Sequence, residues 1–195
     1  MKKEYLEFIT SYDYTAFNYA YFYNDIVNEN PDFKTFVEVG SFLGYSISHL
    51  ANLLRNRSDV RITAADLWQA TPEMAERHQQ IRDVLNECED ILYDLYQTKL
   101  ELSEARYLIK DIRGDSADSA KHFADASIDF CYIDADHSYQ SVKKDVYAWL
   151  PKIKNNGIIA GHDYDQDGVA QAVHEVIGED KIEKIKHHIW SYRVC

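Results

Sequence analysis

The chain has 195 residues, of which 46% are hydrophobic, and this size and composition predict one globular domain rather than a disordered chain. Its 21 Lys and Arg stand against 33 Asp and Glu, a net charge of −12 that disfavours nucleic acid and anionic membranes as partners. No run of about 18 apolar residues predicts a membrane span. The first residues lack the apolar core of a signal peptide, and the three cysteines show no metal-type spacing, so we expect a cytoplasmic protein.

The N-terminal segment is rich in aromatic residues. Tyr14, Phe17, Tyr21 and Asp25 stand at helical spacing, and the dipeptide 30–31 (Asn-Pro) ends the pattern. We therefore expect residues 1–31 to form a helical cap. The cap either packs on the body of the protein or forms a lid over a ligand.

From residue 35 onward, apolar strand patterns alternate with amphipathic helix patterns. Short apolar runs predict strands at 35–39, 60–66, 106–109, 128–133 and 157–161, and residues 184–194 predict two more. Strand and helix alternate at least four times, which is typical of an α/β fold with a doubly wound, mostly parallel sheet. The chain contains no linker or repeat, so residues 1–195 are expected to form a single domain.

Residues 67–104 interrupt this alternation with a helical insertion. Its apolar stripe has alternating spacings of four and three: Met74, His78, Ile81, Leu85, Cys88, Leu92 and Leu95. The stripe predicts one or two amphipathic helices that lie on the body of the protein. A substrate lid and a homodimer contact remain alternatives.

The loop after the first strand carries the first candidate binding site. Ligands of open parallel sheets bind beyond the carboxyl ends of the strands, where Glu38, Gly40 and Gly44 stand. Phe42 occupies the middle glycine position of the dinucleotide fingerprint, which argues against a pyrophosphate there. Asp66 ends the second strand, where it can accept hydrogen bonds from a ribose. Together these residues predict a nucleoside site.

The ends of the fourth and fifth strands carry the second candidate site. Asp134 follows one strand, and His162 and Asp163 follow the other, so the three side chains converge if the strands are neighbours. Converging carboxylates are costly without a cation, which predicts a divalent metal, Mg²⁺ or else Mn²⁺ or Ca²⁺. His137 can reach the same cleft as a general base. An unmetallated polar cluster is the alternative.

The loop and strand pattern over residues 35–194 resembles class I S-adenosylmethionine-dependent methyltransferases. The resemblance implies a Rossmann-like sheet of seven strands with an antiparallel last strand. It also implies that the methionine portion lies at the first loop, the ribose at Asp66, and the adenine at Asp115 and Ser116, although these two are also an ordinary cap pair. Carried over residue by residue, the cofactor site comprises Glu38, Gly40, Ser41, Gly44, Ser46, Asp66, Asp115, Ser116 and Asp134.

One block is more specific. The sequences at 133–139 (Ile-Asp-Ala-Asp-His-Ser-Tyr), 149–151 (Trp-Leu-Pro) and 157–164 (Gly-Ile-Ile-Ala-Gly-His-Asp-Tyr) are similar to macrocin-type sugar O-methyltransferases and cephalosporin-hydroxylase-like proteins. A more distant similarity is to catechol O-methyltransferases. The resemblance implies that Asp134, His162 and Asp163 bind the metal and that His137 is the base. At His162 the sequence departs from the pattern, where an acid is commoner.

The sequence therefore predicts metal-assisted O-methylation of a small molecule or sugar, with sugar and natural-product hydroxyls ahead of catechol-like phenols. Three other functions remain open. The first is an NAD-linked oxidoreductase, which Phe42 opposes. The second is a metal-dependent hydroxylase or hydrolase that uses the Asp/His cluster without a methyl donor. The third is a non-catalytic nucleoside-binding protein.

Overall fold

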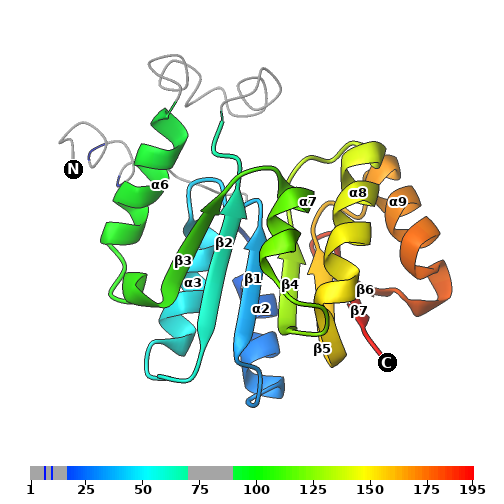
Figure 1. The fold of residues 1–195 in the computed structure, drawn as a ribbon, viewed down its shortest axis with the longest axis horizontal. Coiled ribbons are helices and arrows are strands. Elements are labelled where there is room, and N and C mark those ends of the chain that lie inside the picture. Colours follow the sequence, from blue (N-terminus) through cyan, green and yellow to red (C-terminus); the bar gives the residue numbers. More distant parts are fainter. Residues whose placement is uncertain (1–6, 8–9, 11–16, 70–89) are drawn as a thin grey trace.

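The computed structural model describes Glu7, Thr10 and residues 17–69 and 90–195. Its centre is a seven-stranded sheet with helices on both faces (Figure 1). The strands are β1 (Thr35–Val39), β2 (Arg61–Asp66), β3 (Ile109–Arg113), β4 (Ile128–Ile133), β5 (Ile153–Gly161), β6 (Glu183–Ile185) and β7 (Ile189–Arg193). The helices are α2 (Ala20–Glu29), α3 (Tyr45–Leu54), α6 (Ile91–Glu101), α7 (Ser116–Ser119), α8 (Tyr139–Trp149) and α9 (Asp167–Ile177).

The strand order is β3-β2-β1-β4-β5-β7-β6. The strands β1 to β5 run parallel, whereas β7 is antiparallel to both of its neighbours, β5 and β6. Every residue of the central strand β4 is buried, as expected for a strand covered on both faces. The structure thus confirms the predicted doubly wound sheet with seven strands and an antiparallel last strand.

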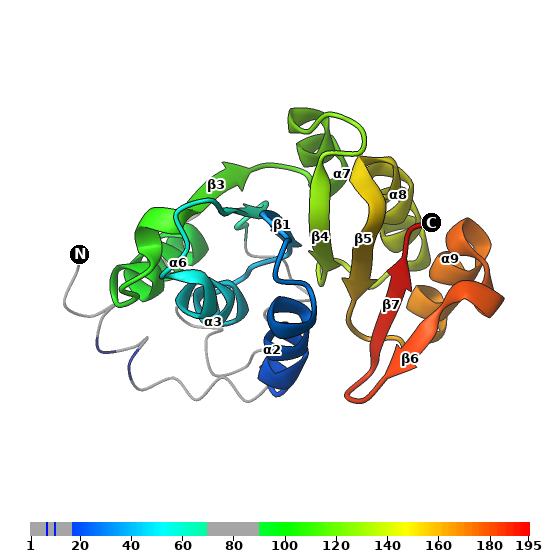
Figure 2. The same ribbon diagram turned by 90° about the horizontal axis from the view of Figure 1, so that it is seen from below.

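The helices form two layers, one on each face of the sheet. Figure 2 shows α2, α3 and α6 on one face and α7, α8 and α9 on the other. Each layer encloses its own apolar core, one around Phe36 and Phe130 and the other around Val37 and Trp149. In the described ranges, none of the helices combines the length and the apolar character that crossing a bilayer requires.

The third strand begins later than its predicted start at residue 106. Arg106–Leu108 forms a 3-10 turn, and β3 follows at Ile109. Since β3 is an edge strand, its pattern mixes buried Ile109 with exposed Lys110 and Arg113 and has no continuous apolar run. Because Leu108 and Ile109 are both apolar, the strand was predicted to begin too early and to include the residues of the preceding turn.

The helix of the N-terminal segment buries a different face from the predicted one. Tyr19 just before α2, with Phe22, Tyr23 and Ile26 on it, is buried. Asp25, on the predicted stripe, is exposed. Both stripes have helical spacing, and the buried one is the more apolar of the two. Tyr14 lies outside the described residues.

The insertion at 67–104 is described in part. Leu92 and Leu95 lie on α6 and are fully buried in the chain's own core, which agrees with an amphipathic helix packed on the body. These two side chains are therefore not available for a contact between subunits. The other members of the predicted stripe, Met74, His78, Ile81, Leu85 and Cys88, lie outside the described residues.

Candidate active site

A cavity of about 390 Å³ opens at the carboxyl ends of the parallel strands, the position where such sheets bind ligands. Most of the predicted cofactor residues line it: Gly40, Ser41, Ser46, Asp66, Asp115, Ser116 and Asp134. His137 lines it as well. The loops after β1, β2, β3 and β4 thus contribute to one cavity, as their predicted positions require.

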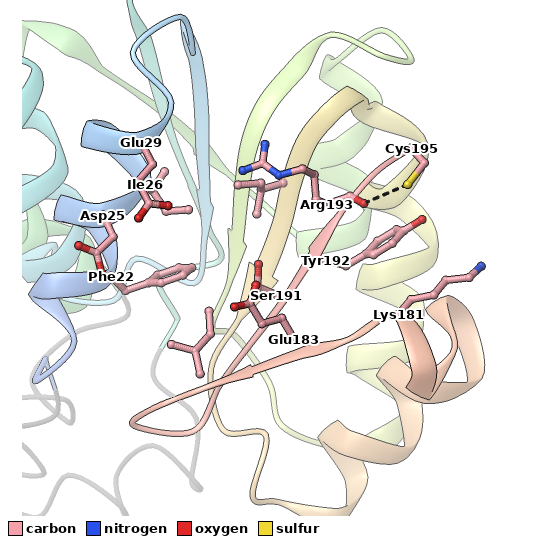
Figure 3. A pocket seen from close by; sticks show the side chains of 12 residues that line it. Phe22, Asp25, Ile26, Glu29, Lys181, Glu183, Ser191, Tyr192, Arg193 and Cys195 are labelled. Carbon is pink, nitrogen blue, oxygen red and sulfur yellow. Dashed lines mark hydrogen bonds between the residues drawn. The ribbon is translucent and has the colours of Figure 1, made fainter.

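A second cavity, of about 650 Å³, lies between α2 and the strands β6 and β7 (Figure 3). Asp25 and Glu29 of α2 line one side of this cavity, and Glu183 and Arg193 line the other. None of the predicted site residues borders it. Because it lies away from the strand ends that carry the glycine loop and the Asp/His cluster, we take the first cavity as the candidate active site.

Gly40 allows the loop after β1 to approach the loop after β4. Its φ is +87°, and a Cβ built on it would stand 2.0 Å from the backbone oxygen of Asp134. Gly44 has a φ of +80° and precedes α3, but it does not line the cavity. A Cβ there would meet Tyr96 of α6 at 2.9 Å. Gly40 therefore shapes the cavity, whereas Gly44 serves the packing of α3 on α6.

Glu38 lies just behind the cavity wall and is 1% exposed. Its carboxylate accepts hydrogen bonds from the Tyr23 hydroxyl at 2.5 Å and from the Ser46 hydroxyl at 2.9 Å. Burial raises the pKa of Glu38 to about 7, although these hydroxyl donors favour the charged form. A buried carboxyl of this kind is poised to ionise when a cation comes near.

The Glu38 carboxyl is expected to make the ligand-free protein less stable as the pH rises. Its folded pKa of about 7 exceeds the ordinary 4.5, so the folded state holds more protons between these values. The free energy of unfolding should fall across this window by at most about 3 kcal/mol. Urea unfolding of wild type and Glu38→Gln at pH 5 and pH 8 measures the difference.

The Glu38→Gln variant should lose that part of the pH dependence. Asp145 provides the control, because burial also raises its pKa, to about 6, and it should contribute in the same direction. Asp145→Asn should therefore retain the part of the pH dependence of the unfolding free energy that comes from Glu38. Equal slopes in wild type and Glu38→Gln would contradict the assignment.

Asp66 connects the loops after β1 and β2. Its carboxylate accepts the backbone N–H of Phe42 at 2.8 Å and that of Trp68 at 2.6 Å. The Trp68 indole N–H in turn donates to the Phe42 carbonyl at 2.9 Å. Both residues have a positive φ, 44° for Phe42 and 46° for Trp68, which is strained for bulky side chains. Each carboxylate oxygen retains acceptor capacity for a ribose hydroxyl.

Asp115 and Ser116 lie at the far end of the cavity, where α8 adds two residues that sequence reasoning missed. Asp115 accepts the Asp118 N–H at 3.0 Å as the cap of α7, and both its oxygens lie 3.0 Å from the Lys144 ammonium. Asp145 is 4% exposed and lines the same end. The signal in the sequence was its spacing: Asp145 stands three residues after Val142 and four before Trp149, so it shares the buried face of α8 with these two side chains.

Asp134, His137, His162 and Asp163 form one cluster. The Nε2 atom of His137 lies 2.7 Å from Asp163 Oδ2 and 3.6 Å from Asp134 Oδ1. The Nδ1 atom of His162 lies 3.2 Å from Asp163 Oδ2. Asp163 has a φ of +56°, a strained conformation that turns it toward the cluster. The two strand ends therefore meet as the sequence predicted.

The charges in this cluster are strongly coupled. Burial disfavours the charged form of His137, but its interactions with Asp134 and Asp163 prevail and raise its pKa to about 9. Burial likewise opposes the charge of Asp163, yet hydrogen bonds from His137 and His162 hold its pKa well below the ordinary value. Without another cation, the imidazolium of His137 thus balances the carboxylates.

The same cluster offers a set of metal ligands. Among the described residues, one ligand atom each of Asp134, His162 and Asp163 lie within 4.8 Å of one another. Two carboxylates and an imidazole suit a divalent cation such as Mg²⁺ or Mn²⁺. The donor set and its spacing therefore fit a metal at the edge of the cavity.

Solved structures and a sequence-family model resemble this chain. No match was found among curated proteins. CalS11, a TDP-rhamnose 3'-O-methyltransferase in calicheamicin biosynthesis, is 13% identical and has a TM-score of 0.62, with 97% of this chain and 91% of that chain covered. TomG from Streptomyces achromogenes, an O-methyltransferase in complex with S-adenosylmethionine, is 13% identical with a TM-score of 0.63 and coverages of 100% and 92%.

An O-methyltransferase from Bacillus cereus in complex with S-adenosylhomocysteine is 16% identical with a TM-score of 0.63, and 99% of this chain and 92% of that chain are covered. At these identities the likeness establishes the fold. A sequence-family model described as a methyltransferase domain matches residues 37–164, which is more than half of the chain and includes the glycine loop and the Asp/His cluster. The chain therefore belongs to this methyltransferase domain family.

Proposed function

We propose that the protein is an S-adenosylmethionine-dependent O-methyltransferase that acts on a hydroxyl of a small molecule or sugar with the help of a divalent metal. One observation carries the proposal: a single cavity is lined both by the glycine loop and Asp66 and by Asp134 and His137 of the Asp/His cluster. A methyl donor and an activated acceptor can meet only where two such sites adjoin.

The residues present fit the methyl donor. Gly40 lines the cavity beside the β4 loop, and Asp66 has acceptor capacity for the ribose hydroxyls. The buried Glu38, with Ser46 between it and the cavity, offers negative charge to the donor's amino group. Asp115, Ser116 and Asp145 would border the adenine at the opposite end. The similar folds of TomG and the Bacillus cereus enzyme, solved with S-adenosylmethionine and S-adenosylhomocysteine, support the choice of methyl donor.

The residues also fit a metal. Asp134, His162 and Asp163 would hold the cation. A divalent cation held there would lower the pKa of an acceptor hydroxyl. Asp134 and Asp163 keep His137 protonated, and an imidazole acts as a base only in its neutral form, so His137 would accept a proton once those carboxylates are paired with the cation instead.

His137 completes the reaction as the proton acceptor. His137 lines the cavity, and its imidazole takes the hydroxyl proton when the ring is neutral. The acceptor oxygen then attacks the methyl carbon in line with the sulfur, and the C–S bond breaks with its electron pair left on sulfur. The products are the methyl ether and S-adenosylhomocysteine. The loops around Gly40 and Asp66 contribute alignment rather than covalent chemistry.

The acceptor class is narrowed by the similar proteins. CalS11 methylates a TDP-rhamnose, and TomG acts in the synthesis of tomaymycin. We therefore place sugar and natural-product hydroxyls first and catechol-like phenols second. A panel of nucleoside-diphosphate sugars and catechol, assayed with S-adenosylmethionine and Mg²⁺, separates these two classes.

Calorimetric titration with S-adenosylhomocysteine tests the donor assignment. We expect saturable binding at micromolar ligand and none with NADH, because Phe42 occupies the middle glycine position that a pyrophosphate would need. Binding of NADH without S-adenosylhomocysteine would instead favour an oxidoreductase. Absence of S-adenosylhomocysteine binding at millimolar concentration would overturn the proposed donor.

Titration with Mn²⁺, followed by electron paramagnetic resonance, tests the metal assignment. Asp163→Asn should weaken Mn²⁺ binding by at least 100-fold, because it removes one of two carboxylate ligands. Asp165→Asn is the matched control, since Asp165 is exposed and pairs with His188 outside the cluster. Methyl transfer that resists EDTA would count against the metal. Iron retained on purification would favour the hydroxylase alternative.

A further inference from the structure

We propose that Tyr19 and Tyr23 are positioning residues of the active site, through which the N-terminal helix orients one carboxylate for the methyl donor and one for the metal. The inference rests on the proposed function and goes beyond it, because these two tyrosines belong to neither the strand ends nor the glycine loop. Each side chain acts through the carboxylate that it contacts.

Tyr23 holds the donor-site carboxylate. It is fully buried, and its hydroxyl donates to Glu38 Oε2 at 2.5 Å. Ser46 donates to the other oxygen, Oε1, at 2.9 Å. The two oxygens of Glu38 therefore have donors from two different helices, Tyr23 on α2 and Ser46 on α3. With Tyr23 removed, only donors in the β1 loop and at the start of α3 would orient this buried carboxylate.

Tyr19 holds the metal-site carboxylate in the same way. It is 4% exposed and lines the cavity, and its hydroxyl donates to Asp134 Oδ2 at 3.0 Å. The other oxygen of Asp134, Oδ1, faces His137 at 3.6 Å. The Tyr19 ring also lies against the His162 ring, with 4.8 Å between the centroids. Tyr19 thus contacts two of the three proposed metal ligands.

The geometry of one helix places both hydroxyls. Tyr19 immediately precedes Ala20, the first residue of α2, and Tyr23 follows four residues later on the same face. Their ring centroids are 6.2 Å apart, and each lies 5.4 Å from the Tyr132 ring on β4. The rings are therefore packed tightly on the sheet, and the helix fixes the separation of the two hydroxyls.

Packing alone does not explain why these residues are tyrosines. Phe22, between them in the sequence, packs against Phe130 and Tyr132 without a hydroxyl. Of the three buried aromatic residues Tyr19, Phe22 and Tyr23, only the two that face a carboxylate carry a hydroxyl. Burial raises the pKa of both phenols well above 10, so both remain proton donors at neutral pH. Outer hydrogen-bond partners of this kind commonly set the affinity of the group that they orient.

Conservative variants separate the two roles. Tyr19→Phe should weaken Mn²⁺ binding by about 10- to 100-fold and leave S-adenosylhomocysteine affinity within about twofold. Tyr23→Phe should do the reverse, with about tenfold or more loss of S-adenosylhomocysteine affinity and an Mn²⁺ affinity within about twofold. Tyr21→Phe is the matched control on the same helix, because the Tyr21 hydroxyl donates to the Lys186 carbonyl away from the site.

A second measurement tests whether each tyrosine acts through its carboxylate. In a Glu38→Gln background, adding Tyr23→Phe should cost much less S-adenosylhomocysteine affinity than it does alone, and Tyr19→Phe should behave likewise toward Mn²⁺ in Asp134→Asn. Full additivity, or equal loss of both ligands in both variants, would overturn the inference. If the wild-type protein binds neither S-adenosylhomocysteine nor Mn²⁺, the proposed function is wrong. If the wild-type protein binds both but the two variants lose the same ligand affinities, only the positioning roles of Tyr19 and Tyr23 are wrong. Circular dichroism verifies that each variant is folded.

Discussion

Replacing His137 with glutamine is expected to lower kcat for methyl transfer by about 10²- to 10⁴-fold, the range typical of a lost general base. The affinity for S-adenosylhomocysteine should stay within about twofold, because His137 lies at the metal end of the cavity rather than at the glycine loop. Glutamine can still donate a hydrogen bond to Asp163, so the cluster keeps that contact while losing its proton acceptor. Turnover of the best acceptor from the panel gives the measurement.

The control for this substitution is His188→Gln. His188 is exposed, and its Nδ1 atom lies 3.3 Å from Asp165 Oδ1. Because this pair lies outside the Asp/His cluster, replacing His188 should leave kcat unchanged. Mn²⁺ affinity distinguishes the base from an additional ligand. If His137→Gln lost Mn²⁺ binding as strongly as Asp163→Asn, the histidine would be a ligand, and the base would have to be sought elsewhere. Unchanged kcat in His137→Gln would contradict its assignment as the base.

The strand-end chemistry was accessible from the sequence for a geometric reason. Parallel neighbouring strands bring their carboxyl ends to one edge, so Asp66, Asp134 and Asp163, each at the end of an apolar run, could be expected to converge. The structure brings Asp66 and Asp134 to one cavity and Asp163 beside it. The local pattern around each strand was sufficient, because the sheet supplies the long-range part.

The site residues that come from helices could not be predicted from local sequence patterns. Tyr23 lies close to Glu38 only because α2 packs against the sheet with one particular face, and two stripes of that segment have helical spacing. Lys144 and Asp145 reach the cavity because of how α8 crosses the strand ends. Glu38 itself, expected to contact the donor, lies one layer behind the cavity wall. Which face of a helix packs against the sheet depends on tertiary contacts, and no local sequence motif predicts it.

Replacing Gly40 with alanine is expected to affect both stability and ligand binding. The added Cβ would stand 2.0 Å from the Asp134 oxygen and 2.8 Å from the Ala135 Cα, both backbone atoms that cannot turn aside. The positive φ of 87° adds strain for any side chain. Together these costs should lower the free energy of unfolding by about 2–5 kcal/mol. Urea unfolding measures this loss.

The same substitution should weaken S-adenosylhomocysteine binding by at least 100-fold, because relief of the clash must separate the β1 and β4 loops that border the cavity. Gly114→Ala is the matched control at the end of β3, where the nearest atom to a new Cβ is the Ser119 hydroxyl at 3.8 Å. That variant should stay within about 1 kcal/mol of wild type, since contact at this distance is ordinary van der Waals packing. Equal losses of stability and of S-adenosylhomocysteine affinity in Gly40→Ala and Gly114→Ala would contradict the prediction. The cavity would then not depend on the close approach of the β1 and β4 loops at Gly40.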